Sequence, residues 1–317
     1  MRVVFAGSPG ISTASLKAVV SWYEVCCVLT NTDKPAGRGR TPQPVPLAAA
    51  AAELGIPLVK ADRVDEKTEE NIRSRSPDIL VVVAYGHIFS PDFLRLFPEG
   101  GVNLHHSLLP KYRGPSPITA AILNGDTETG ITIQRLAREM DAGDIILQES
   151  FSLTGKETTG SLTDFCSLTG ADLLLRALDL LSAGTAEFCP QNPEDASWCG
   201  LIRKTDGIVD WQLSSSAIER MIRAYNPWPY ATTVFRGKNL RLLRASVYGG
   251  GVTVGASTAV RPGMVAGIDK EEGILIQTGN GILLVKELQM EAKKPLDWRS
   301  FLNGHPGFIG SFLGAPA

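Results

Sequence analysis

The sequence lacks the glycine-rich patterns that identify several large enzyme classes. It contains no G-x-x-x-x-G-K-[ST] phosphate-binding loop and no G-x-S-x-G nucleophile elbow. The glycine turn after its first apolar run reads Gly7-Ser8-Pro9-Gly10, which does not match G-x-G-x-x-G. These absences argue against a P-loop nucleotide hydrolase, an α/β-type serine hydrolase and a dinucleotide-dependent enzyme.

Metal-binding, secretory and membrane-spanning features are also missing. The five cysteines show no metal-ligand spacing, and the chain has only four histidines. Cys26 and Cys27 lie in an apolar run, which is typical of buried free thiols in a reducing cytosol. No apolar run approaches the ~18–20 residues of a membrane span, and Met1 leads directly into a strand-like run. We therefore expect a cytoplasmic protein that needs no metal.

Charge is scarce overall but unevenly distributed. Residues 1–202 carry 17 Lys and Arg against 24 Asp and Glu, whereas residues 203–317 carry 14 against 9. A basic C-terminal part on an acidic N-terminal part hints at a polyanionic partner that contacts the C-terminal part. Chance variation is the alternative explanation.

The N-terminal part alternates apolar runs with amphipathic segments. Strands are predicted at residues 2–7, 25–30, 78–86 and 101–107, with helices at residues 12–20, 46–55 and 65–75 between them. Continuous apolar strands alternating with helices are typical of a parallel sheet covered on both faces. Residues 129–136 and 144–153 then predict an antiparallel pair, and residues 162–184 a long helix.

The pattern changes after residue 187. Residues 188–206 mix proline, asparagine and charges without periodicity, which indicates a linker. After a helix at residues 214–225, short strands separated by glycines run from residue 232 to residue 289. Such strands predict a small barrel of the kind that binds nucleic acids or sugars. The expected domains are thus residues 1–187 and 207–317.

Asn103 and His105 stand at the end of the fourth predicted strand. Residues i and i+2 of a strand project from the same face, so both side chains would point together at the carboxyl edge of the sheet. A loop stiffened by Pro110, Pro115 and Pro117 follows. A stiff apolar loop beside two hydrogen-bonding groups suits a flat organic ligand. A satisfied core or loop histidine is an equally good interpretation of His105.

Two further segments contain polar residues with ambiguous roles. Asp141, in the sequence EMDAGDII, suits an ordinary Asp-x-Gly turn, but near His105 its carboxylate would orient the imidazole and raise its pKa. Residues 31–47 are basic through Lys34, Arg38 and Arg40, and their glycines and prolines argue against regular structure. This segment reads either as a flexible arm that grips phosphates or as a solvated loop.

Taken together, these segments resemble the folate-dependent formyltransferases. NLHHSLLPKYRGPSPI is similar to the signature of that family, with its N-x-H-x-S-L-L-P core. The resemblance runs nearly end to end, through the segments VFAGSP, TDKPAGRGR, VVVAYG, MDAGDII, DGIVDW, IRAYNPWP and AKKPLDWRSFLNG. The basic loop and the C-terminal half narrow it to the branch that acts on tRNA.

The resemblance implies a fold, an activity and a set of site residues. The fold would be a Rossmann-like, doubly wound sheet followed by an OB-like barrel. The activity would be transfer of the formyl group of 10-formyltetrahydrofolate to the α-amine of methionyl initiator tRNA, by a monomer of bacterial type. The implied catalytic residues are Asn103, His105 and Asp141; the implied folate-binding residues are Ser107, Leu108, Leu109, Pro110, Tyr85, Gly86 and Ile88; the implied tRNA-binding residues are Arg38, Arg40 and Lys204. Asn103 and a protonated His105 would stabilise the developing oxyanion, and Asp141 would hold the imidazolium.

Some positions depart from the family pattern. Gly10 and Ile11 replace an acidic and an aromatic residue, and Leu201 replaces the first of two linker lysines, where Arg203 could substitute. His106 stands at a variable position and receives no role. Two alternatives stay open: formyl transfer to a small amine, such as an amino-sugar nucleotide, and a non-catalytic RNA-binding protein with a decayed enzyme domain.

Overall fold

The computed structural model describes residues 1–36, 41–250 and 261–314 of the chain. It divides them into two compact units. Unit 1 comprises Met1–Ile118, Glu128–Ser152 and Ser161–Gly200, and unit 2 comprises Thr119–Thr127, Leu153–Gly160 and the chain from Leu201 onward. The predicted Arg38 and Arg40 lie outside the described residues.

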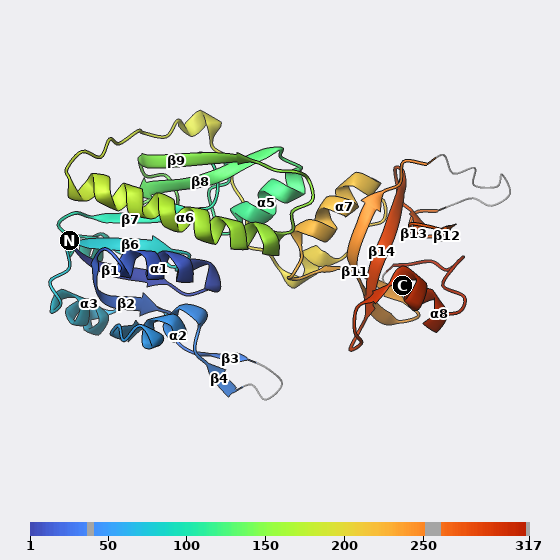
Figure 1. The fold of residues 1–317 in the computed structure, drawn as a ribbon, viewed down its shortest axis with the longest axis horizontal. Helices are drawn as coiled ribbons and strands as arrows, with labels where there is room; N and C mark the ends of the chain where they lie inside the picture. The colour runs from blue at the N-terminus through green and yellow to red at the C-terminus, as the bar shows by residue number, and fades with distance from the viewer. Residues whose placement is uncertain (37–40, 251–260, 315–317) are drawn as a thin grey trace. The chain divides into compact units, whose positions relative to one another are not determined.

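Unit 1 is built on a seven-stranded sheet with the order β5-β2-β1-β6-β7-β8-β9 (Figure 1). The strands are β1 Arg2–Gly7, β2 Glu24–Thr30, β5 Leu58–Lys60, β6 Ile79–Val83, β7 Gly101–His105, β8 Glu128–Arg135 and β9 Ile145–Ser152. The first five are parallel, while β8 is antiparallel to β7 and to β9. The predicted parallel sheet with an antiparallel pair is confirmed.

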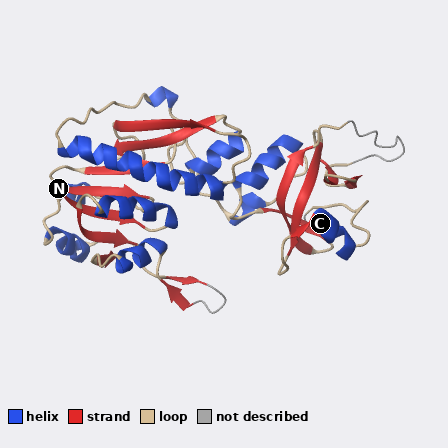
Figure 2. Ribbon diagram, in the orientation of Figure 1, coloured by secondary structure: helices blue, strands red, loops and turns tan. Residues whose placement is uncertain are grey.

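Helices cover this sheet (Figure 2). They are α1 Thr13–Val20, α2 Pro46–Glu53, α3 Glu66–Arg73, α4 Pro91–Leu94 and α6 Thr159–Ser182, with the 3-10 turns η1 Gly10–Ser12 and η2 Pro193–Asp195. Helix α5, Pro117–Asn124, begins in unit 1, and its residues from Thr119 belong to unit 2. Gly170 of α6 allows the helix to approach β7 closely, because a Cβ there would lie 2.9 Å from a methyl group of Leu104. The long helix thus packs against the strand that carries Asn103 and His105.

Unit 2 contains a six-stranded antiparallel sheet with the order β10-β11-β14-β13-β12, and β15 pairs with β14. Its elements are η3 Lys204–Gly207, α7 Ser215–Ala224, β10 Ala231–Phe235, β11 Lys238–Val247, β12 Val265–Asp269, β13 Gly273–Gln277, β14 Ile282–Met290, β15 Leu296–Asp297 and α8 Trp298–Gly304. The C-terminal segment links the two edges of this sheet. Leu313 donates to Gly263 beside β12, and Gly314 donates to Val234 of β10. This closure gives the barrel-like form expected from the sequence.

The prediction that residues 31–47 lack regular structure is wrong for part of this segment. Residues 34–36 form β3 (Lys34–Ala36), which pairs antiparallel with β4 (Thr41–Gln43). Among the residues that the structure describes, these two strands form a separate two-stranded sheet. Pro35 and Pro42 sit opposite one another in this ribbon, where outward-facing positions need no N–H donor. Proline therefore does not exclude a two-stranded pair.

The predicted linker, residues 188–206, divides between the two units. Cys189 exchanges two backbone hydrogen bonds with Ile145 of β9, and Ser197 and Cys199 run alongside Arg113. Two short earlier segments join unit 2 because they bond to α7 and the loop after it: the Arg220 side chain donates to Leu123, and Gly160 donates to Asn226. The limits expected for the domains remain a proposal.

None of the helices in the described chain has both the length and the apolar character needed to span a membrane. Within residues 1–36, 41–250 and 261–314, no three His, Cys, Asp or Glu side chains gather in a group that could hold a metal ion.

Candidate active site

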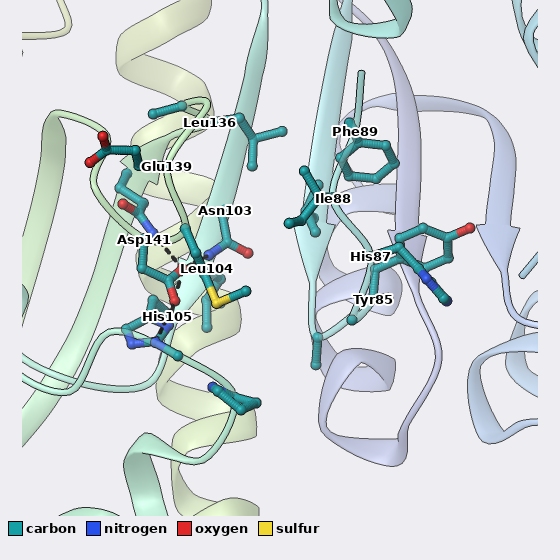
Figure 3. Close-up of a pocket in the computed structure, with 18 of the residues that line it drawn as sticks. Tyr85, His87, Ile88, Phe89, Asn103, Leu104, His105, Leu136, Glu139 and Asp141 are labelled. Carbon is teal, nitrogen blue, oxygen red and sulfur yellow. Dashed lines mark hydrogen bonds and ion pairs between the residues drawn. The ribbon is translucent and has the colours of Figure 1, made fainter. Parts of the chain in front are cut away.

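The sheet brings the three predicted catalytic residues together (Figure 3). Asn103 and His105 lie on β7, opposite Gln134 and Thr132 of β8. Asp141 comes from the loop between β8 and β9. Its carboxylate Oδ1 lies 3.3 Å from the Asn103 amide nitrogen and 3.5 Å from His105 Nδ1. The antiparallel pair thus folds the distant acid back onto the strand end.

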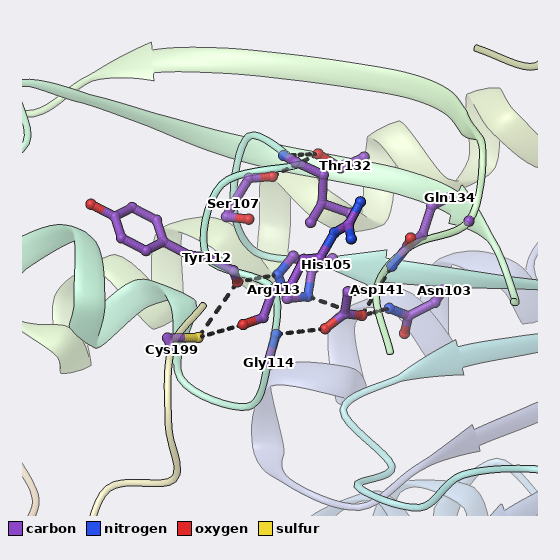
Figure 4. Close-up of polar contacts among 12 residues, drawn as sticks. Asn103, His105, Ser107, Tyr112, Arg113, Gly114, Thr132, Gln134, Asp141 and Cys199 are labelled. Carbon is purple, nitrogen blue, oxygen red and sulfur yellow. Dashed lines mark hydrogen bonds and ion pairs between the residues drawn. The ribbon is translucent and has the colours of Figure 1, made fainter. Parts of the chain in front are cut away.

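Asp141 is held from several directions (Figure 4). Its Oδ1 also accepts a hydrogen bond from Gln134 Nε2 at 3.0 Å, and its Oδ2 accepts one from the Gly114 N–H at 2.8 Å. Its backbone is left-handed, with φ of 54°. Ala84 and Tyr112, which also contribute to the site, share this conformation at 53° and 56°. Such residues cost of order 1–3 kcal/mol each and cluster at functional sites.

His105 is almost completely buried, with 5% of its surface exposed. Its Nε2 lies 2.9 Å from the Tyr112 carbonyl oxygen, which only accepts, so Nε2 carries a proton. Burial lowers the pKa of His105, although Asp141 and the Tyr112 hydrogen bond act in the opposite direction. Asp141 thus raises this pKa as predicted, but desolvation outweighs the carboxylate, and the expectation of a protonated His105 is wrong. The imidazole is neutral near pH 7, and Nδ1 faces Asp141.

A cavity of about 420 Å³ opens beside these residues. Its apolar wall comes largely from the β6–α4 connection and the β8–β9 loop, through Tyr85, Ile88, Phe89, Leu94, Leu136 and Met140. Tyr85 and Phe89 stack at 5.4 Å between ring centroids. Asn103, His105 and Asp141 supply polar groups along one side (Figure 3), and Gln134 also lines the cavity. The predicted folate-binding residues Tyr85, Gly86 and Ile88 all line this cavity.

The predicted folate-binding loop Ser107–Pro110 does not line it. Ser107 and Leu109 are buried, and Thr132 binds both ends of this stretch: its hydroxyl donates to the Ser107 carbonyl and accepts from the Leu109 N–H. These bonds anchor the loop to β8. Its contact with folate stays a prediction.

The structure also places residues to which the sequence analysis gave no role. Gln134 and Gln191 donate to Asp141, and Arg113 donates to Gln191. A polar Gln134 inside the buried run of β8 is the one signal that sequence reading could have used. His106 is 8% exposed and borders the cavity, and its Nε2 has no hydrogen-bond partner in the described chain. Lys204 is exposed at the start of η3, as a tRNA contact requires.

Comparisons with known proteins agree with this arrangement. A formyl transferase family model matches residues 1–178, and a formyl transferase C-terminal domain model matches residues 201–306. A methionyl-tRNA formyltransferase of Treponema denticola is 39% identical over 98% of each chain, and one of Roseiflexus castenholzii is 41% identical over 94% of this chain and 95% of its own. The chain belongs to the methionyl-tRNA formyltransferase family.

Solved structures share the fold of this family member at low identity. The sugar 3N-formyl transferase WlaRD, determined in the presence of dTDP and 5-N-formyl-THF, aligns with a TM-score of 0.64 at 18% identity, covering 93% of this chain and 99% of its own. HypX from Aquifex aeolicus, in complex with tetrahydrofolic acid, gives 0.62 at 17%, covering 100% and 51%.

Proposed function

We propose that the chain transfers the formyl group of 10-formyltetrahydrofolate to the α-amine of methionyl initiator tRNA. The observation that carries this proposal is the convergence of Asn103, His105 and Asp141 on one cavity, in a chain about 40% identical to methionyl-tRNA formyltransferases over nearly its full length. The enzyme is thus a one-carbon transferase that prepares the initiator tRNA for translation.

The cavity suits a folate. Its volume lies within the range of small-molecule sites, ~300–1,000 Å³, and such sites combine apolar walls with a few convergent polar groups. The aromatic side chains of Tyr85 and Phe89 and the aliphatic side chains of Ile88 and Leu136 offer flat apolar contacts. Ile88 is 74% exposed, so its side chain is available to a ligand.

The chemistry requires a donor for a developing oxyanion. The α-amine forms a bond to the formyl carbon, the bond from that carbon to N10 breaks, and one proton moves from the amine to N10. While the carbon is tetrahedral, its oxygen carries negative charge. The Asn103 amide gives one N–H to Asp141, and its second N–H can serve this oxygen. A single such donor typically contributes ~10²–10³ in rate.

His105 and Asp141 handle the proton. The neutral imidazole has its proton on Nε2, so Nδ1 can accept a proton in the direction of Asp141. The nearby carboxylate stabilises the imidazolium that results. This assignment replaces the protonated His105 expected from the sequence with a proton acceptor that later returns the proton to N10.

An acceptor as large as tRNA accounts better for the second unit than a small amine does. Residues 203–317 are basic in excess, and Lys204 is exposed. Arg38 and Arg40 belong to the same proposed contact, although they lie outside the described residues. Formyl transfer to an amino-sugar nucleotide would leave these charges without a purpose.

We place this activity in the cytoplasm, where charged initiator tRNA is used, and assign it to a monomer, since one chain supplies all three catalytic residues. Light scattering should then give a mass near 34.0 kDa.

The test is formyl transfer by the purified chain to Met-charged initiator tRNA, with the formylated product measured by mass spectrometry. Asn103→Ala and Asp141→Asn should each lower kcat by ~10²–10³. Both variants should bind 5-formyltetrahydrofolate as the wild type does within threefold.

Asn71→Ala on α3 is the control, because it removes an exposed amide far along the chain from the site. It should retain full activity. A wild-type chain that formylates an amino-sugar nucleotide but not the charged tRNA would refute the proposed acceptor. Full turnover by Asn103→Ala would refute the role given to that amide.

A further inference from the structure

Arg113 is a buried cation without an acidic partner. Only 5% of its surface is exposed, and no carboxylate pairs with it in the part of the chain that the structure describes. Its Nε and Nη2 instead donate to one oxygen, Gln191 Oε1, at 3.1 and 2.7 Å. The ring of Trp198 lies 5.7 Å from the guanidinium carbon. An isolated buried charge is costly. We therefore expect the negative charge that balances Arg113 to be connected to it through Gln191.

The Gln191 amide connects Arg113 to the surroundings of Asp141 through further hydrogen bonds. Its Nε2 lies 3.2 Å from Gln134 Oε1, 2.9 Å from the Asp141 carbonyl oxygen and 2.7 Å from the Gly143 carbonyl oxygen. Gln134, which is 2% exposed, then donates from Nε2 to Asp141 Oδ1 at 3.0 Å. A continuous path of hydrogen bonds thus connects the guanidinium of Arg113 with the carboxylate of Asp141.

The direction of every bond in this path is fixed by its two ends. A guanidinium only donates, so Gln191 must present its oxygen to Arg113. An ionised carboxylate only accepts, so Gln134 must present its nitrogen to Asp141. The remaining atoms, Gln191 Nε2 and Gln134 Oε1, then face each other as donor and acceptor. Both amide dipoles therefore run from the cation to the anion, an arrangement in which successive hydrogen bonds strengthen one another.

We propose that Arg113, Gln191 and Gln134 form a positioning relay that couples the buried guanidinium to Asp141 and fixes its carboxylate against Asn103 and His105. This inference rests on the proposed function. Gln191 holds the backbone carbonyl of Asp141 and Gln134 holds its side chain, so the relay constrains both ends of a residue in the left-handed conformation.

The relay acts through Asp141 and not by contact with the reactants. Neither Arg113 nor Gln191 lines the cavity, whereas Gln134 lines it beside Asp141. Releasing the relay should therefore disturb the geometry of proton transfer while leaving the binding surfaces in place. A misplacement of ~1 Å at a reacting group can cost ~10² in rate.

The experiment removes the relay amides with near-isosteric methionines. Gln134→Met, Gln191→Met and the double variant are assayed for formyl transfer with both substrates varied. Each single variant should lower kcat by ~10–100-fold with both KM values within threefold, because the lost interaction serves the transition state. The kcat of the double variant should be no more than threefold below that of the less active single variant, because the two residues act as a unit.

Gln134→Asn provides a second variant that stays polar but withdraws the amide from Asp141, and it should show the same loss of kcat. Asn71→Leu is the matched control: Arg75 there donates from Nε and Nη2 to the amide oxygen of Asn71, so the same kind of bidentate contact is lost on α3. It should leave kcat unchanged.

Two outcomes would overturn the proposed relay. One is a loss of kcat in the double variant equal to the product of the two single losses, and the other is raised KM values with a normal kcat. These outcomes leave wild-type formyl transfer intact. Absence of transfer by the wild type would instead refute the proposed function. Binding of 5-formyltetrahydrofolate by every variant confirms that the losses do not come from a collapsed cavity.

Discussion

His106 makes the protein sensitive to acid. Burial, with a smaller contribution from His105, lowers the pKa of His106 to about 3. In the unfolded chain the same imidazole titrates near 6.5. Between these values the unfolded chain binds more protons than the native one, so the free energy of unfolding falls as the pH falls. From pH 6.5 to pH 5 this single group should cost about 2 kcal/mol.

Replacing this histidine tests the effect. His106→Leu should lose less stability than the wild type between pH 6.5 and pH 5, by about 2 kcal/mol, in urea unfolding followed by circular dichroism. Because Nε2 has no hydrogen-bond partner in the described chain, the substitution should cost little at pH 7. Equal acid sensitivity in both proteins would mean that His106 is not buried in the neutral form.

At the same scale, the sequence predicted which side chains meet but not their electrostatics. The i,i+2 spacing placed Asn103 and His105 on one face, and the family resemblance added Asp141. The sign of the His105 pKa shift depends on burial by neighbouring elements, which strand spacing does not reveal. Gln191 was assigned to a linker, because nothing in its local sequence shows that it reaches Asp141.

Among the structural elements, the loop that follows β7 fixes the site. Gly114 donates its N–H to Asp141, and its φ of 117° is one that other residues rarely adopt. A Cβ at this position would lie 2.2 Å from the carbonyl oxygen of Cys199. Gly114→Ala must therefore shift the loop or the Ser197–Cys199 segment, and kcat should fall by ~10²-fold or more.

Gly184 offers a matched control. It also has a positive φ, 65°, but a Cβ there would meet no atom within 4 Å. Gly184→Ala should cost about 1 kcal/mol through the backbone alone and keep kcat within twofold. Thermal unfolding and formyl transfer measured on both variants separate strain from steric conflict. Normal turnover by Gly114→Ala would show that the loop does not fix Asp141.

Long apolar runs in the sequence predicted their strands well, whereas the short strands β3, β4 and β5 were not predicted. The strands β1, β2 and β6 read as largely apolar runs because both faces of a parallel sheet are buried. β5 has three residues, too few for a periodic pattern. The hairpin of β3 and β4 contains prolines that normally signal a loop. Local sequence thus identifies an element only when burial repeats along it.

At the scale of the whole molecule, two compact units divide the charge. The segment predicted as a linker supplies Ser197 and Cys199 to unit 1 and Lys204 to unit 2. Its first part carries no apolar periodicity because it is held by backbone bonds to Ile145 and Arg113 and not by a buried face. Composition alone therefore indicated a change of architecture near residue 200 but not which residues belong to which unit.

The excess of positive charge in residues 203–317 predicts that tRNA binding depends on salt. Each neutralised phosphate releases counterions, so the logarithm of the binding constant falls linearly with the logarithm of the salt concentration. Raising KCl from 50 to 200 mM should weaken binding of Met-charged initiator tRNA at least tenfold in a filter-binding assay. Binding of 5-formyltetrahydrofolate, which needs few ionic contacts, should change less than threefold.

Two lysine variants show whether the exposed linker contributes. Lys204→Ala should lower the slope of this salt dependence by about 1, the loss of one phosphate contact. Lys67→Ala removes an equally exposed lysine from α3, in the acidic part of the chain, and should leave the slope unchanged. If both variants keep the wild-type slope, Lys204 does not touch the phosphates. If the wild type itself shows no salt response, the acceptor is not bound through its backbone, and the basic C-terminal part needs another explanation.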